Sequence, residues 1–331
     1  TNFKLRAWRL SDVASLAENA NNINVWNNVR DYFPHPYSEA DGRRFIEMAF
    51  SDFQPVTEMA VVVNGKAVGG IGILPKSDVK RITAEIGYWL GENYWNRGIM
   101  TEAIREMTTH AFTRFPLHKL YAPVFAFNAA SQRALQKAGF EREAILKQAA
   151  IKNGKIIDLH YYSLLKSQWL KSTRIRSFRD DDRPVLKDLL YEAVLQSNDS
   201  PLPRDIVEKP EMAVYIRDFG TQKDDFCLLA ELNGKVTGGI WIRILAGAVK
   251  GYGHVDTETP ELVVSLFRAY RKQGIGTQLM RKMIEHVREK GYKQVSLSVQ
   301  KANDAVRMYR KCGFEVVREN EADYIMVLKL T

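Results

Sequence analysis

The amino-acid sequence repeats itself at an interval of about 170 residues. Three short motifs occur in each half, and they keep the same order. The matching pairs are Leu5–Asp12 with Ile175–Asp182, Asn64–Lys66 with Asn233–Lys235, and Lys137–Phe140 with Lys311–Phe314. Solenoid repeats are much shorter, roughly 20–50 residues. The sequence therefore predicts a tandem duplication of one domain, residues 1–171 and residues 172–331.

Composition limits the class of protein. The chain has 331 residues, of which 45% are hydrophobic, so each half is long enough to bury its own core. No apolar run approaches the roughly 20 residues that span a bilayer, and the N-terminus lacks a targeting pattern. We therefore expect no membrane partner. The two cysteines indicate no disulfide framework and fit a reducing compartment, so a cytoplasmic protein is expected.

The net charge of +9 comes from scattered lysines and arginines. A nucleic-acid-binding surface needs these residues in a cluster, so no nucleic-acid partner is expected. A mild positive excess is enough for a ligand that bears phosphate groups. No pair of histidines has the spacing of metal ligands, so no metal is expected either.

The predicted elements follow the same order in both halves. In the first half we expect strands at 3–8, 59–63, 67–74, 82–90 and 119–127, helices at 11–20, 38–50, 98–115 and 131–138, a loop at 21–36, and two strands around Asn153-Gly154. In the second half we expect strands at 173–178, 262–267 and 294–299, helices at 183–196, 213–218, 274–290 and 304–311, and terminal strands. Asn64-Gly65 and Asn233-Gly234 each predict a hairpin turn. Strands and helices do not alternate regularly, so each half predicts an α+β fold, a mostly antiparallel twisted sheet flanked by helices.

The sharpest motif is Arg271–Thr277, Arg-Lys-Gln-Gly-Ile-Gly-Thr, between a predicted strand and a long helix. Glycine lets the backbone approach a ligand closely, and the first N–H groups of a helix have no partner within it. Together with the helix dipole they form a site for a pyrophosphate. The first half has Trp95–Thr101 in the equivalent place. This pattern differs from the P-loop, which needs Gly-Lys-Ser/Thr after a longer spacing.

With the motifs around it, this turn resembles the GCN5-related N-acetyltransferase (GNAT) family. The second half contributes Arg271–Gly276 and Asn303–Phe314 to the resemblance. The matching segments of the first half are Glu85–Leu90, Tyr94–Ala103, Asn128–Ser131 and Lys137–Phe140. The first half is most similar to the RimJ/RimL branch of ribosomal-protein alanine acetyltransferases, which Phe33–Tyr37 and Asn153–Asp158 also match. Each half is thus identified as a GNAT domain.

The resemblance implies acetyl-CoA as the acetyl donor. Its pyrophosphate would bind the N–H groups of Arg97–Thr101 and Gln273–Thr277, and its pantetheine arm would pair beside strands 88–90 and 266–268. The asparagines at 128 and 303 would hydrogen-bond that arm. The implied cofactor-binding residues are Tyr88, Trp89, Leu90, Arg97, Gly98, Ile99, Met100, Thr101, Asn128 and Ser131 in the first half, and Leu266, Phe267, Arg268, Arg271, Lys272, Gln273, Gly274, Ile275, Gly276, Thr277 and Asn303 in the second.

Two residues of the first half depart from the family pattern. Trp95 stands where the family usually has Gln or Arg, although the RimJ/RimL branch tolerates it. Met100 stands where Gly or Ala is usual, and its bulk lies beside the expected pyrophosphate.

Amide formation needs an uncharged amine, because an ammonium has no lone pair, and a base assists the loss of its proton. Glu85 and Glu261 lie on the strands before the two glycine turns and are the candidate bases. Tyr309 stands where GNAT enzymes often carry the acid that protonates the departing thiolate. Leu135 takes that place in the first half, so we expect the second half to be the catalytic one.

The sequence therefore predicts an N-acetyltransferase that moves acetyl from acetyl-CoA to a primary amine, either of a small molecule or of a protein N-terminus. Neither Cys227 nor Cys312 has a partner for a covalent intermediate, which favours direct attack in a ternary complex. The alternatives are a non-catalytic acyl-CoA sensor or scaffold, one catalytic and one degenerate lobe, and two halves with different acceptors. The acceptor, a longer acyl donor and the oligomeric state remain open.

Overall fold

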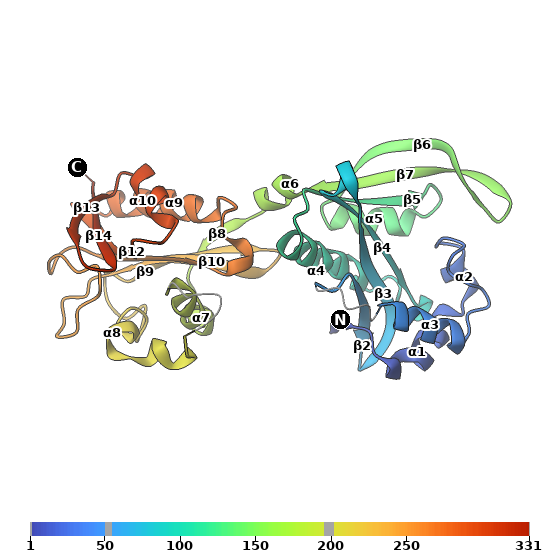
Figure 1. Ribbon diagram of the computed structural model, residues 1–331, viewed down its shortest axis with the longest axis horizontal. Helices are drawn as coiled ribbons and strands as arrows, with labels where there is room; N and C mark the ends of the chain where they lie inside the picture. Colours follow the sequence, from blue (N-terminus) through green and yellow to red (C-terminus); the bar gives the residue numbers. More distant parts are fainter. Residues whose placement is uncertain (1, 50–54, 195–201, 331) are drawn as a thin grey trace. The chain divides into compact units, whose positions relative to one another are not determined.

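The computed structural model describes residues 2–49, 55–194 and 202–330. Internal contacts divide the chain into two compact units, Thr1–Lys171 and Ser172–Thr331, which we describe separately (Figure 1). The expected helix ends at Phe50 and Gln196 lie outside the described residues.

The first unit begins with a strand and ends with a short helix. Its strands are β1 (Phe3–Ala7), β2 (Glu58–Val63), β3 (Lys66–Pro75), β4 (Thr83–Leu90), β5 (Lys119–Phe125), β6 (Glu141–Lys152) and β7 (Lys155–Leu165). Its α-helices are α1 (Val13–Ala20), α2 (Ile23–Trp26), α3 (Glu39–Ala49), α4 (Ile99–Arg114), α5 (Ala129–Lys137) and α6 (Lys166–Lys171). Single 3-10 turns lie at Leu10–Asp12, Asp78–Lys80 and Glu92–Tyr94.

The second unit repeats this order with fewer helices among its described residues. Its strands are β8 (Arg174–Ser177), β9 (Phe226–Leu232), β10 (Lys235–Arg243), β11 (Glu261–Leu266), β12 (Gln294–Gln300), β13 (Glu315–Glu319) and β14 (Asp323–Lys329). Its α-helices are α7 (Arg183–Ala193), α8 (Pro210–Ala213), α9 (Ile275–Glu289) and α10 (Ala305–Lys311). Short 3-10 segments lie at Asp180–Asp182, Arg204–Glu208 and Arg268–Tyr270.

Each unit contains one seven-stranded sheet with the same strand order. The first sheet runs β1-β2-β3-β4-β5-β7-β6, and the second runs β13-β14-β12-β11-β10-β9-β8, which is the same topology listed from the other edge. Neighbouring strands are antiparallel except for the central pairs β4–β5 and β11–β12, which are parallel. The predicted α+β fold, with a mostly antiparallel sheet flanked by helices, is confirmed.

Helices cover both faces of each sheet (Figure 1). In the first unit α1 and α3 pack on one face, around Trp8, Leu16 and Ile46. The long helix α4 buries Ile104 and Met107 completely against the sheet. In the second unit α7 packs on one face, and α9 and α10 lie on the other (Figure 1). Apolar residues at helical spacing explain why α4 and α9 form where the sequence predicts them.

Both predicted hairpin turns form. Asn64 and Gly65 have φ of 48° and 83°, and Asn233 and Gly234 have φ of 52° and 75°. Two consecutive positive φ angles define the tight turn that matches the twist of the flanking strands, and Asn-Gly adopts it most easily. These turns set the register at the start of each hairpin, and, counted from the turn, a β-bulge after Val62 in the first and after Val236 in the second shifts the remaining pairs by one residue.

Two predicted elements were wrong. The segment expected to be a loop contains the short helix α2, because the Asn22 side chain caps it by accepting hydrogen bonds from the next turn. The helix expected at 213–218 instead begins at Pro210, which favours the first helical position, and ends at Ala213. The residues after Ala213 form successive turns.

An arginine–aspartate pair explains the motif that opens each half. Arg176 donates two hydrogen bonds to the Asp182 carboxylate at 2.7 and 2.9 Å, and Asp182 also accepts from the Arg179 N–H. Arg6 and Asp12 make the same bidentate contact in the first unit, at 2.6 and 2.8 Å. The pair ties the first strand of each unit to the start of the following helix.

We expect Asp182→Asn to lower the free energy of unfolding by about 2 kcal/mol, because a charge-assisted bidentate contact is lost. The matched control is Asp180→Asn in the same turn, where the exposed ion pair with Arg183 is worth at most about 1 kcal/mol. Hydrogen bonding to Arg176 lowers the pKa of Asp182, so its stabilisation is present above the unfolded pKa of about 3.9 and is lost as the pH falls through the folded value. Urea titrations at neutral pH and near pH 3 measure both effects. Equal midpoints for the two variants at neutral pH would contradict the assignment.

Candidate active site

The two central strands of the first sheet separate at Glu85. β4 pairs with β5 only over residues 83–85. β4 continues beside β3 as far as Leu90, so its other edge carries main-chain groups that no strand uses. The second sheet separates at the equivalent residue, because β11 and β12 pair only at Glu261 and Ser296. Each free edge fits an extended ligand that hydrogen-bonds like an added strand.

The turn that follows each of these strands has the same backbone in both units. Asn96 and Gly98 have φ of 58° and 76°, and Lys272 and Gly274 have φ of 59° and 84°. The left-handed conformation at the glycine leads directly into the helix. The first hydrogen bond of α4 runs from the Glu102 N–H to the Gly98 carbonyl, so the N–H groups before it have no acceptor within the helix. This is the arrangement that binds phosphate groups.

Trp95 departs from the family pattern but keeps a structural contact. Its indole Nε1 donates to the Leu90 carbonyl at 2.7 Å. In the second unit the Arg271 Nε donates to the equivalent carbonyl, that of Leu266, at 2.9 Å. Either side chain therefore ties the end of the strand to the turn, which explains why two unlike residues occupy this position.

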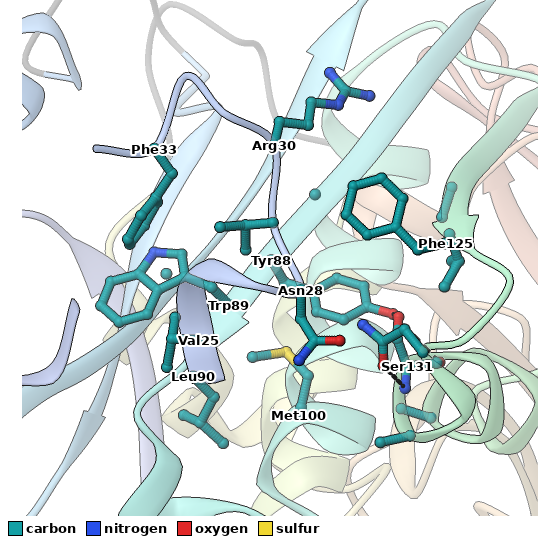
Figure 2. Close-up of a pocket in the computed structure, with 18 of the residues that line it drawn as sticks. Val25, Asn28, Arg30, Phe33, Tyr88, Trp89, Leu90, Met100, Phe125 and Ser131 are labelled. Atoms are coloured by element: carbon teal, nitrogen blue, oxygen red, sulfur yellow. Dashed lines mark hydrogen bonds between the residues drawn. The ribbon is translucent and has the colours of Figure 1, made fainter. Parts of the chain in front are cut away.

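A cleft of about 1400 Å³ lies along the free edge of β4 (Figure 2). Strand β4, the turn before α4, the start of α5 and the segment 28–37 contribute to its walls. Every site residue that the sequence predicted for the first half lines it: Glu85, Tyr88, Trp89, Leu90, Arg97, Gly98, Ile99, Met100, Thr101, Asn128 and Ser131. The fold thus brings these residues together from three segments, although their individual roles stay predictions.

A pair of hydroxyl groups lies inside this cleft. The hydroxyl oxygens of Tyr88 and Ser131 are 2.8 Å apart (Figure 2). Ser131 lies in the first turn of α5, and its N–H donates to the side chain of the capping residue Asn128 at 3.0 Å. Burial raises the pKa of Tyr88 above its usual range. A helix N-terminus favours negative charge nearby, so these hydroxyls are suited to a departing anion.

Glu85 lies where the strands separate, but its carboxylate is already paired. Arg30, from the segment that crosses the cleft, forms an ion pair with one carboxylate oxygen. Lys76 lies 3.3 Å from the other. Both carboxylate oxygens of Glu85 therefore already have a cationic partner.

Sequence reasoning missed Glu58, which also lines the cleft. It lies at the start of β2 and pairs with Gly72 on β3. Burial raises its pKa to about 7. The Asn64-Gly65 turn alone would place Glu58 opposite Ile71, and a β-bulge between Val61 and Val62 shifts the pairing to Gly72, so the turn did not reveal this neighbour.

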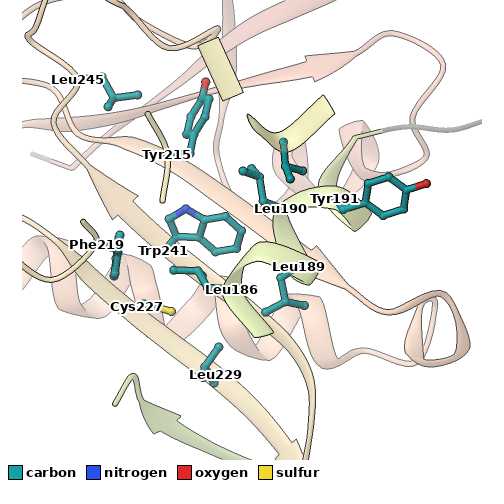
Figure 3. Close-up of a cluster of buried hydrophobic side chains, with 11 residues drawn as sticks. Leu186, Leu189, Leu190, Tyr191, Tyr215, Phe219, Cys227, Leu229, Trp241 and Leu245 are labelled. Atoms are coloured by element: carbon teal, nitrogen blue, oxygen red, sulfur yellow. The ribbon is translucent and has the colours of Figure 1, made fainter. Parts of the chain in front are cut away.

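The corresponding face of the second sheet is filled. Trp241 occupies the place of Gly72, and Cys227 that of Glu58, since the two hairpins have equivalent registers. Trp241 is fully buried among Leu186, Leu190, Tyr215 and other side chains from α7 and the following segment (Figure 3). The space that forms a cleft in the first unit is a hydrophobic core in the second.

Glu261 is enclosed in the second unit. It is 3% exposed, and its carboxylate accepts hydrogen bonds from the Tyr215 hydroxyl and from the Gly253 N–H. Gly251 and Gly253 belong to the long connection between β10 and β11, and a side chain at Gly251 would overlap this carboxylate. Burial raises the pKa of Glu261. It is the first residue of β11 and not, as expected, toward the middle of the strand, and its carboxylate faces other protein groups.

Several other residues predicted for the second half make contacts within that unit. Arg271 pairs with Glu192, and Lys272 with Asp304, at 2.9 and 2.7 Å. Tyr309 is buried against Phe314, and burial raises its pKa. Asn303 accepts a hydrogen bond from the first N–H of α10. Thr277 lines a smaller cavity of about 560 Å³ between α9 and α10.

Family models match both units. The Acetyltransferase (GNAT) domain matches residues 2–141, and the Acetyltransferase (GNAT) family matches residues 191–314. The chain belongs to the GNAT acetyltransferase family. It carries two GNAT domains in tandem, as the sequence predicted.

Several known proteins are similar to parts of this GNAT chain. The putative ribosomal N-acetyltransferase YdaF of Bacillus subtilis is 33% identical over 34% of this chain and 61% of its own length. The uncharacterized N-acetyltransferase p20 of Bacillus licheniformis is 35% identical over 26% of this chain and 48% of its own length. The chain thus spans about half the length of these relatives. The structure of Mycobacterium smegmatis RimJ in complex with CoA-disulfide is 21% identical, covers 50% of this chain and 83% of its own, and has a TM-score of 0.46.

The described residues contain neither a membrane-spanning helix nor a metal-binding cluster. None of their helices is both long and apolar enough to cross a membrane. No group of three or more His, Cys, Asp or Glu side chains within the described ranges is arranged to hold a metal ion.

We expect Trp241→Ala to destabilise the second GNAT domain by about 3–5 kcal/mol, because it leaves a cavity in a packed core. The control is Val249→Ala in the same domain, whose side chain is 41% exposed and whose truncation should change stability by less than about 0.5 kcal/mol. Urea unfolding followed by circular dichroism measures both. A cost below about 1 kcal/mol for the tryptophan variant would mean that this face is open and not packed.

Proposed function

We propose that the first GNAT domain transfers an acetyl group from acetyl-CoA to a primary amine. The observation that carries this proposal is the cleft along the free edge of β4, where the residues predicted for donor binding line one cavity. When bound, acetyl-CoA supplies the acetyl group as a thioester. The volume of about 1400 Å³ is ample for a pantetheine arm together with an acceptor.

The chain offers separate contacts for each part of the donor. The unpaired edge of β4 after Glu85 suits the amide groups of an extended arm. The N–H groups of Arg97–Thr101 suit a pyrophosphate, and a side chain at Gly98 would meet no atom within 4 Å, so this turn is accessible. Arg133 and Lys137 on α5 add positive charge to the same cleft. The residues present therefore fit coenzyme A.

We assign the protonation of the departing thiolate to the hydroxyl pair of Tyr88 and Ser131. Leu135 occupies the place of Tyr309, so the first domain has no tyrosine at that position. The hydrogen-bonded hydroxyls at the start of α5 lie in the cleft and can pass a proton to the sulfur. Direct attack of the amine is favoured, since both cysteines belong to the second domain.

The second domain is, in this proposal, the degenerate lobe. The sequence favoured it as the catalytic half because of Tyr309, but Glu261 is enclosed and Trp241 fills the acceptor face. We infer that it arose by duplication and lost its acceptor site, since the strand order and the glycine turn are shared. A cytoplasmic location belongs to the same proposal, because the donor and the unpaired thiols fit a reducing compartment.

The acceptor is proposed only as a class. The side chains that line the cleft on the side of α3 and segment 28–37 include Phe33, Tyr37, Phe45 and Trp89. Apolar walls of this kind accept the body of an amine and leave its nitrogen to the polar groups. YdaF is named as a putative ribosomal N-acetyltransferase, which makes a peptide N-terminus the first acceptor to test.

The release of free CoA thiol from acetyl-CoA tests the proposed function. The acceptors are peptides beginning with Ala or Ser, an L-amino acid, and spermidine. We expect release that depends on one of these amines, with acetyl found on its nitrogen. Binding of acetyl-CoA without transfer to any amine would favour the sensor alternative.

Ser131→Ala and Tyr309→Phe distinguish the two domains. If transfer occurs in the first domain, Ser131→Ala should lower kcat by about 100-fold, because the thiolate loses its proton source, while the acetyl-CoA Kd changes little. Tyr309→Phe should leave kcat unchanged. The reverse pattern, measured by the same thiol assay and by calorimetry, would place catalysis in the second domain.

A further inference from the structure

We propose that Glu58 is the residue of the first domain that binds the acceptor amine and removes its proton, and that Gly72 keeps the space in which the Glu58 carboxylate lies. This inference rests on the proposed function. It assigns the base to the acceptor side of the cleft, on β2, and not to the strand that carries the donor.

The register of the sheet places Glu58 in a row with two glycines. Glu58 on β2 pairs with Gly72 on β3, and Gly72 pairs with Gly87 on β4. Residues paired in this way in antiparallel strands point to the same face. On this face, both residues between the Glu58 side chain and the free edge of β4 are glycines, so no side chain separates the two.

The carboxylate lies across the neighbouring strand. A Cβ built on Gly72 would lie well under 3.0 Å from all three atoms of the Glu58 carboxyl group, so any other residue at position 72 would displace it. A Cβ on Gly87 would meet no atom within 4 Å. One strand spacing, about 5 Å, separates β3 from β4. The carboxylate therefore faces an open space just beyond the point where β4 and β5 separate, which is large enough for an amine nitrogen.

Glu58 is the unpaired carboxylate among those lining this cleft in the described structure. No hydrogen bond or ion pair joins it to another described residue. The other charged groups on this side are paired: Asp41 with Arg44, Asp31 with Lys152, and Glu85 with Arg30 and Lys76. The remaining cations of the lining, Arg97, Arg133 and Lys137, belong to the turn before α4 and to α5.

Burial supports the same role. It raises the pKa of Glu58 to about 7. A base works best when its pKa lies near the working pH, because it is then ionised yet still able to hold a proton. A buried carboxylate without a partner also gains most from a bound cation, which an ammonium supplies.

The acceptor nitrogen loses two protons during the transfer. The acceptor enters as an ammonium and gives one proton to the Glu58 carboxylate. The resulting amine attacks the thioester carbon, so a C–N bond forms as the C–S bond breaks. The second proton lost from nitrogen replaces the one that Ser131 and Tyr88 give to the sulfur. Glu58 returns its proton to water, and the net products are the amide, the free thiol and one proton.

The second domain lacks both parts of this arrangement. Cys227 and Trp241 stand in the places of Glu58 and Gly72, and Val263 stands in the place of Gly87. The equivalent face of the described second unit thus lacks the carboxylate, the hollow that holds it and the open space beyond it. This agrees with an acceptor site in the first domain alone.

Three variants test the proposal. Glu58→Gln removes the base and keeps the shape of the side chain. Gly72→Ala leaves the carboxylate in the protein but pushes it out of its place. Glu47→Gln, an exposed carboxylate on α3 outside the cleft, is the control. Circular dichroism and calorimetry with acetyl-CoA establish that each variant is folded and binds the donor.

We expect Glu58→Gln to lower kcat by at least about 100-fold with an unchanged acetyl-CoA Kd, and Gly72→Ala to lower it by at least tenfold. The control should match the wild type. In the wild type, kcat/KM should rise with pH through about 7, because Glu58 must lose its proton to act as a base. Glu58→Gln should lose this rise, whereas the titration of the amine itself is common to both proteins.

Each outcome decides the proposal. A Glu58→Gln variant that keeps kcat within threefold of the wild type, or whose pH profile with the same amine matches that of the wild type, overturns the role of base. A change in acceptor KM alone overturns it as well and leaves Glu58 only as a binding residue. If the wild type acetylates no amine, both the proposed function and the role of Glu58 fail. If the wild type is active and the Glu58→Gln variant is equally active, only the role of Glu58 fails.

Discussion

The early separation of two parallel strands is the constraint on which the rest of each GNAT domain depends. β4 and β5 stop pairing after Glu85, and β11 and β12 pair at Glu261 only. Main-chain groups that lose a ladder partner must find another, and here they line the place where a ligand fits. The sheet stays continuous because β4 remains bonded to β3 and β5 to β7. The opening therefore forms inside a rigid frame, and the glycine turn and the start of α5 are held around it.

Side-chain size on one face of the sheet then decides what each opening can do. Gly72 and Gly87 place no side chain on the face of the first sheet beside the point where β4 and β5 separate. Trp241 and Val263 occupy the same positions in the second sheet, and Trp241 is fully buried. Because the two domains share their topology, this difference cannot come from the fold. It follows the general rule that function resides in sites placed on a fold and not in the fold itself.

Most elements were predictable because their signals are local. The Asn-Gly turns, the apolar spacing of α4 and α9, and the glycine before each helix act within a few residues. The errors arose where a weaker local preference decided the outcome, at the Asn22 cap and at Pro210. The donor side of the site was accessible to the same reasoning, since Arg97–Thr101 and Asn128–Ser131 are short motifs. Glu58 could not be predicted in this way, because the space for its carboxylate depends on Gly72, which is fourteen residues away and on another strand.

The sequence alone determined that there are two related domains, that each is a mixed sheet with a glycine turn before a long helix, and that both resemble acetyltransferases. Tertiary structure alone decided which of the two matching glutamates faces a cleft. Glu85 and Glu261 have the same place on their strands, yet a longer connection and Tyr215 enclose the second. Burial is a property of all the neighbours of a residue at once, and those neighbours come from segments far apart in the chain. For that reason the sequence favoured the second domain through Tyr309, while the packing around Trp241 and the space beside Glu58 favour the first.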